Sequence, residues 1–132
     1  MLPITAFYAG LAALWLIYLS GRVIGLRRSR RASLGDGGHD DLPHARAAHR
    51  NAAETLPIGL ILLALAEGLG APGLLLHASA LLLLAGRVIH AGYFLRPGRE
   101  MRFRVLGMAL TLGTLGFLAL GLIAHGLAEM IG

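Results

Sequence analysis

The sequence predicts an all-α integral membrane protein, built as a bundle of four membrane-spanning helices. Of its 132 residues, 56% are hydrophobic and only 14% are charged. A soluble domain of this size cannot hide that much apolar surface. The apolar residues form four runs, each long enough to cross a hydrocarbon core of about 30 Å. All twelve Lys and Arg residues are arginine. They flank the runs instead of lining a soluble face, which argues against a nucleic-acid partner.

The four runs are separated by short polar turns, and one domain covers residues 1–132. Arginines follow the first run and none precedes it, which is the reverse of a cleavable signal peptide and predicts a retained helix. The second run begins after a loop rich in Asp and Gly, is polar in its first half, and contains Pro57, which we expect to kink it. We expect helices over about residues 3–29, 42–69, 73–95 and 100–131.

The arginines also predict the topology. They crowd the ends of the runs that meet at loop 33–43 and at turn 96–99, whereas turn 68–72 and both termini carry none. The positive-inside rule therefore places the Arg-rich loops in the cytoplasm and both termini outside it. The chain has no cysteine, which excludes a disulfide framework, a thiolate nucleophile and a Cys-based metal site.

Polar side chains gather at the ends of the runs that this topology places near the cytoplasmic interface. At about 100° per residue, Arg46, Arg50 and Glu54 form one polar seam on the second helix. An Arg within an apolar span needs a partner or a ligand, or it must snorkel to the interface. A cationic layer of this kind favours a small anionic ligand from the cytoplasm and an apolar co-substrate from the lipid. Its candidate residues are Arg46, His49, Arg50, Asn51, Glu54, Arg87, His90, Tyr93 and Arg104.

Simpler interpretations remain open for these groups. Interfacial arginines such as Arg27 and Arg28 commonly hold phospholipid headgroups or satisfy topology. Arg50 and Glu54 have the spacing of an i,i+4 salt bridge. Arg87 and His90, one turn apart in an apolar span, suit either a buried network or a ligand. No paired His or carboxylate spacing indicates a metal site. The small residues Ala109, Gly113 and Gly116 favour close helix packing, either within the chain or between protomers.

Three motifs resemble those of the MAPEG family, the membrane-associated proteins in eicosanoid and glutathione metabolism. They are His49-Arg-Asn-Ala-Ala-Glu54-Thr-Leu-Pro57, Gly86-Arg-Val-Ile-His90 and Arg104-Val-Leu-Gly-Met108. The chain is most similar to the short bacterial branch, which shares the Gly35-Asp-Gly-Gly38 loop. The resemblance covers nearly the whole chain. It implies four transmembrane helices per chain, a homotrimer in the bacterial inner membrane, and sites between protomers near the cytoplasmic face.

The resemblance also implies roles for single residues. Asn51 and Glu54 would hold the amino and carboxylate groups of glutathione, the co-substrate, and Arg104 would be the catalytic residue that stabilises its thiolate. The other glutathione-binding candidates are Arg46, His49, Arg50, Arg87, His90 and Tyr93. The chain departs from the family pattern at three positions. Ala47 stands where enzymatic members usually carry an Arg, Phe94 replaces a frequent Tyr, and Val105 replaces a hydroxyl residue.

The favoured hypothesis is therefore a glutathione-dependent membrane transferase or peroxidase that acts on lipophilic electrophiles or lipid hydroperoxides. Its partners would be further copies of itself, membrane lipids, glutathione and a lipophilic small molecule, without a metal. The alternative is a non-catalytic membrane protein that binds lipid or an anionic metabolite in the same layer. A transporter is less favoured, because the polar groups lie in one leaflet and offer no continuous path across the membrane.

Overall fold

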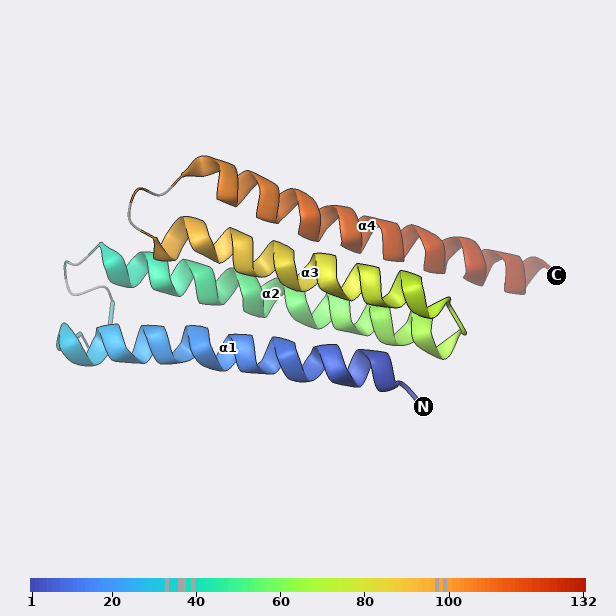
Figure 1. Cartoon of the computed structure of the whole chain (residues 1–132), viewed down its shortest axis with the longest axis horizontal. Helices are drawn as coiled ribbons and strands as arrows, with labels where there is room; N and C mark the ends of the chain where they lie inside the picture. The colour runs from blue at the N-terminus through green and yellow to red at the C-terminus, as the bar shows by residue number, and fades with distance from the viewer. Residues whose placement is uncertain (33, 36–37, 39, 97, 99) are drawn as a thin grey trace.

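The computed structural model describes residues 1–32, 34–35, 38, 40–96, 98 and 100–132, which form four helices and no strand (Figure 1). The predicted all-α, four-helix fold is confirmed. Two loops named in the sequence analysis, 35–38 and 96–99, lie partly outside the described residues. The helix that contains Pro57 is not interrupted at that residue. The helices are α1 (Pro3–Ser29), α2 (Asp41–Gly68), α3 (Gly73–Leu95) and α4 (Met101–Ile131).

Each helix is long and apolar enough to cross a membrane. In their most apolar windows, only 11% to 44% of the residues are buried inside the chain, so most apolar side chains face outward. Such a surface needs lipid or further copies of the chain around it. Both termini and the α2–α3 connection lie at one end of the bundle (Figure 1). The arginines lie toward the opposite end, which we call the Arg-rich end.

Helices α2 and α3 form the centre of the packing. Helices α1 and α4 do not touch within the described part of the chain, whereas α3 contacts all three other helices and so does α2. The inner face of α2 is built from small and aliphatic residues at helical spacing, including Ala48, Ala52 and Leu56. A Cβ atom at Gly59 would lie 2.5 Å from Cδ2 of Leu83, so glycine is what lets α2 approach α3 here.

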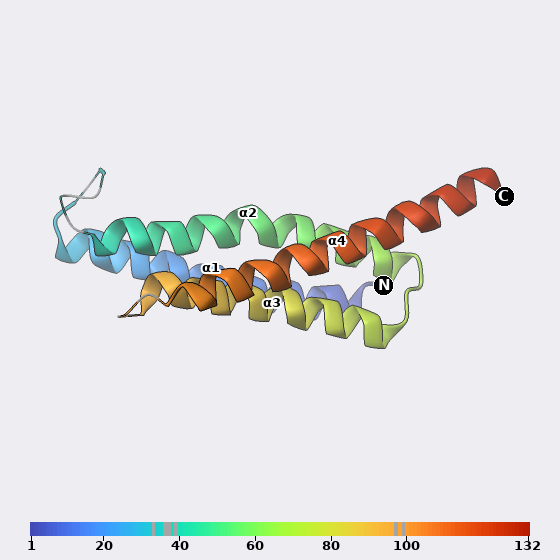
Figure 2. The ribbon, with the colours of Figure 1, turned by 90° about the horizontal axis from the view of Figure 1, so that it is seen from above.

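The closest approach of two backbones joins α3 to α4. A Cβ atom at Gly107 would lie 2.5 Å from the backbone nitrogen of His90 and 2.6 Å from the carbonyl oxygen of Gly86. Figure 2 shows α4 crossing over α3, with its C-terminal end diverging from the bundle. Gly113 and Gly116, expected to form a packing face, have nothing within 4 Å of a built Cβ among the described residues. That face is therefore open in the part of the chain that the structure describes.

Polar contacts tie α1 down at the end opposite the arginines. The Glu67 carboxylate accepts hydrogen bonds from the backbone nitrogens of Ile4, at 2.9 Å, and Thr5, at 2.7 Å. Two donors that lack an intrahelical partner at the start of α1 are thereby satisfied by a side chain from α2. The Tyr8 hydroxyl shares a 3.1 Å hydrogen bond with Nδ1 of His77 on α3. Helix α1 is thus anchored to both neighbours.

Candidate functional site

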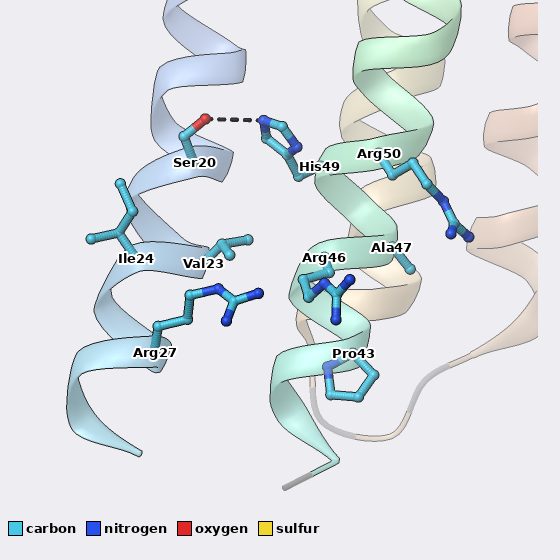
Figure 3. A pocket seen from close by; sticks show the side chains of 9 residues that line it. All are labelled: Ser20, Val23, Ile24, Arg27, Pro43, Arg46, Ala47, His49 and Arg50. Carbon is cyan, nitrogen blue, oxygen red and sulfur yellow. Dashed lines mark hydrogen bonds between the residues drawn. The ribbon is translucent and has the colours of Figure 1, made fainter. Parts of the chain in front are cut away.

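A cleft between α1 and α2 opens at the Arg-rich end and has a volume of about 560 Å³. In Figure 3, Arg27 from α1 extends toward α2, where Arg46 lies, while Arg50 points away from α1. Arg27 and Arg46 therefore bring two guanidinium groups to one space, which makes it a site for an anion, and Arg50 lines its edge. We call it the α1–α2 cleft. Its lining residues are Ser20, Val23, Ile24, Arg27, Pro43, Arg46, Ala47, His49 and Arg50.

The upper wall of the α1–α2 cleft is fixed by a bond between its two helices. The Ser20 hydroxyl and Nε2 of His49 share a hydrogen bond of 3.0 Å (Figure 3). On the other wall, Nη1 of Arg27 donates to the carbonyl oxygen of Ala32 at 3.1 Å. These bonds hold His49 and Arg27 in place before any ligand arrives, which lowers the entropy cost of binding.

The polar seam of α2 continues from this cleft onto the outer surface. Nε of Arg50 lies 3.8 Å from Oε1 of Glu54, and their side chains are 72% and 63% exposed. An exposed pair at this distance contributes little to stability, so both groups are free to bind something else. Asn51 donates to the carbonyl oxygen of Ala47 at 2.8 Å, which leaves its amide oxygen as an acceptor.

Arg87 and His90 lie elsewhere, between α3 and α4, and are 1% and 2% exposed. Nε of Arg87 donates to the hydroxyl of Thr111 at 2.8 Å, and Nη2 donates to the carbonyl oxygen of Gly107 at 3.2 Å. Within the described residues, Nη1 of Arg87 and Nε2 of His90 have no hydrogen-bond partner. Arg87 therefore belongs to a buried hydrogen-bonded network with α4, His90 is buried beside it, and a ligand role for the two residues stays a prediction.

Arg104 and Tyr93 form a third group, on α4 and α3. The Arg104 guanidinium carbon lies 5.6 Å from the centroid of the Tyr93 ring, within the range of a cation–π interaction. Arg104 is exposed, and so is Val105 beside it. The Tyr93 ring also meets Phe94 edge to face, at 4.9 Å between centroids. The Arg104 cation is therefore presented outward from α4.

One chain thus divides the nine predicted residues among three places. Arg46, His49 and Arg50 meet in the α1–α2 cleft, with Asn51 and Glu54 on the adjoining surface of α2. The remaining residues belong to α3 and α4, and α4 does not touch α1 in the described ranges. In the part of the chain that the structure describes, no group of three His, Asp or Glu side chains is placed to hold a metal ion.

Two residues of the cleft were not among the sequence candidates. Ser20 and Arg27 lie seven residues apart, which is close to two helical turns and puts them on one face of α1. This spacing can be read from the sequence. However, four other arginines lie near the end of α1, so the sequence alone does not distinguish Arg27 from them. The structure distinguishes Arg27 from its neighbours. Among residues 27–31, all of which the structure describes, Arg27 is the one that lines the cleft.

Comparison with known proteins identifies the family of the chain. The model of the MAPEG family matches residues 5–124. This chain belongs to the MAPEG family. Among its relatives is inner membrane protein YecN of Escherichia coli strain K12, which is 39% identical over 108 residues, or 82% of this chain and 81% of YecN. YecN of E. coli O6:H1 strain CFT073 matches with the same identity and coverage.

Membership of the MAPEG family confirms the resemblance read from the three motifs. The chain is a membrane protein of the family of glutathione and eicosanoid metabolism. Its four apolar helices and the name of its inner-membrane relative agree with an inner-membrane location.

Proposed function

We propose that this MAPEG protein binds glutathione at its Arg-rich end and uses it as a membrane transferase or peroxidase. The observation that carries the proposal is the α1–α2 cleft, where Arg27, Arg46 and Arg50 line one space of about 560 Å³. Glutathione carries two carboxylates and one ammonium group. The arginines suit the carboxylates, and the exposed Glu54 carboxylate beside Arg50 suits the ammonium group.

Arg104 is the residue we assign to the thiol. A guanidinium beside a thiolate favours the charged form and lowers the pKa of the thiol. The thiolate sulfur would attack the electrophilic carbon of a lipophilic substrate and form a thioether. The bond from that carbon to its leaving group breaks, the leaving group departs with the bonding electrons, and the thiol proton passes to solvent. With a lipid hydroperoxide the thiolate would attack the terminal oxygen and break the O–O bond, which gives a sulfenic acid and a lipid alkoxide that takes up a proton to become the alcohol. A second glutathione thiol then attacks the sulfenic acid and gives the disulfide and water.

We further propose that the complete site needs two copies of the chain, in a homotrimer whose Arg-rich end faces the cytoplasm. Arg104 projects from α4, which contributes no lining residue to the α1–α2 cleft within the described part of the chain. A neighbouring copy is able to supply its Arg104 to this cleft. The open face of α4 around Gly113 offers a surface for such packing.

Ala47 favours a second candidate function. It lines the α1–α2 cleft at the position where enzymatic members usually carry an Arg. A site without that guanidinium holds an anionic metabolite or a lipid less selectively and need not orient a thiol. The alternative is therefore a membrane protein that binds without catalysis.

Equilibrium binding of glutathione to the detergent-purified protein tests the proposal. Arg46→Gln removes one cation from the cleft, and we expect glutathione to bind about tenfold more weakly. Arg28→Gln is the matched control, because Arg28 is exposed at the same end of the bundle, on α1, and does not line the cleft. Equal binding by wild type and Arg46→Gln would count against the proposed site. Saturable binding without glutathione consumption across a panel of electrophiles would favour the second candidate.

A further inference from the structure

A second cavity at the Arg-rich end lies between α1, α2 and the C-terminal turn of α3, with a volume of about 550 Å³. We call it the α1–α2–α3 cavity. It is separate from the α1–α2 cleft. Arg22 is two residues from Ile24 of the cleft, so the two side chains leave α1 about 160° apart. Ala45 and Ala47 differ by the same amount on α2. The two spaces therefore lie on opposite faces of the α1–α2 pair.

The cavity carries uncompensated positive charge. Arg22 enters it from α1 and Arg96 from the end of α3. Asp41 also lines it. Its Oδ2 accepts a hydrogen bond from Arg30 at 2.9 Å, which balances its charge, and its Oδ1 has no hydrogen-bond partner among the described residues. Among the described residues, neither Arg22 nor Arg96 forms an ion pair. Arg96 lies over the Phe103 ring, at 5.6 Å from the centroid, which leaves its hydrogen-bond donors open to a ligand.

The rest of the wall is apolar. Leu26, Phe94 and Leu95 line the same cavity. Arg22 precedes Arg30 by eight residues, so it starts about 12 Å deeper along α1 at about 1.5 Å per residue. A guanidinium at that depth lies below the helix end and reaches upward by snorkelling. The cavity therefore combines two guanidinium groups with an apolar wall.

We propose that the α1–α2–α3 cavity binds the phosphate headgroup of an anionic phospholipid. Arg22 and Arg96 hold the phosphate oxygens from two helices, and Leu26, Phe94 and Leu95 pack against the glycerol and the first methylene groups. Arginine is suited to phosphate because its planar guanidinium donates two parallel hydrogen bonds. A bound lipid would also link α1 to α3 at this end of the bundle.

The size and walls of the cavity favour a lipid over free phosphate. A water molecule occupies about 30 Å³ in the liquid, so the space is far larger than a small anion needs. An inorganic phosphate would also leave oxygens against Leu26, Phe94 and Leu95, where no donor satisfies them. A phospholipid places its charged and apolar parts against the matching walls.

The test is native mass spectrometry of the detergent-purified protein, titrated with phosphatidylglycerol or with phosphatidylcholine of the same acyl chains. We expect the wild type to bind phosphatidylglycerol about tenfold more tightly, and each of Arg22→Gln and Arg96→Gln to weaken it about fivefold. Arg22→Lys keeps the charge and should retain most of the affinity. Arg28→Gln, outside the cavity on the same helix end, should bind like the wild type.

Several results would overturn the proposal. One is a double variant Arg22→Gln/Arg96→Gln that keeps the preference for phosphatidylglycerol. Another is an equal loss in Arg28→Gln, because that would mean general charge attraction. A third is inorganic phosphate at millimolar concentration stabilising the protein against heat through Arg22 and Arg96, with no preference between the two lipids, because that would identify free phosphate as the ligand. Glutathione binding by the double variant checks its fold and should be unchanged.

Discussion

Arg87 on α3 donates from Nε to the hydroxyl of Thr111 on α4 at 2.8 Å, and both residues are buried between the two helices. The Thr111 hydroxyl in turn donates to the carbonyl oxygen of Gly107 at 2.8 Å. The buried guanidinium is thus held by α4 rather than by a carboxylate. Arg104 lies one turn before Gly107, so this network also fixes where α4 presents Arg104.

Thr111→Val should destabilise the protein by about 1–3 kcal/mol, because it leaves a buried Arg donor without its acceptor. Thr114→Val is the matched control. Thr114 is also buried on α4, but its hydroxyl donates to Leu110 of its own helix. Thermal unfolding in detergent measures both. If the two variants lose equal stability, the bond between Arg87 and Thr111 has no special importance.

Gly107→Ala should separate α3 from α4 and cost about 1–3 kcal/mol or more, because the added Cβ would meet the backbone of α3 at 2.5 Å. Gly126→Ala adds the same atom on the same helix, away from the Gly113 face, with nothing within 4 Å among the described residues. Helix propensity alone favours alanine over glycine by about 0.5–1 kcal/mol. Unfolding of each variant checks the prediction, and a stable Gly107→Ala protein would contradict the close approach.

Glu67→Ala should release the start of α1, since the carboxylate holds the backbone nitrogens of Ile4 and Thr5. We expect a loss of about 1–2 kcal/mol, the usual range for removing a helix cap. Faster hydrogen exchange at those two amides is the direct measurement. Glu129→Ala, an exposed carboxylate near the end of α4, is the control. Unchanged exchange in Glu67→Ala would mean that other contacts hold α1.

Mixing two inactive variants tests whether the glutathione site is shared between copies. Arg46→Gln weakens glutathione binding in the α1–α2 cleft, and Arg104→Ala removes the cation that stabilises the thiolate. At a glutathione concentration too low to occupy the Arg46→Gln cleft, neither variant alone gives a thiolate signal. If each site joins the cleft of one copy to Arg104 of the next, a mixed trimer contains roughly one intact site in three. Co-expression should then restore a partial thiolate signal that neither variant gives alone. A site built from one chain predicts no restoration.

The fold was predictable because apolar run length and Arg placement depend on local sequence. The places of the polar residues were less predictable. The sequence correctly identified Arg87 and His90 as polar groups in an apolar span. It did not predict that their side chains face α4, because that depends on the close approach of α3 and α4 at Gly86 and Gly107, about twenty residues apart in the sequence. The cap that Glu67 provides for α1 depends in the same way on packing that no local pattern reveals.

The ultraviolet absorbance of bound glutathione thiolate tests the central claim most directly. The wild type, saturated with glutathione at neutral pH, should show the thiolate band, and Arg104→Ala should bind glutathione without it. Arg102→Ala is the control, because Arg102 is exposed on the same turn of α4 and pairs with Glu100. It should keep the band. A thiolate band of equal strength in Arg104→Ala, or no glutathione binding by the wild type at millimolar concentration, would contradict the account.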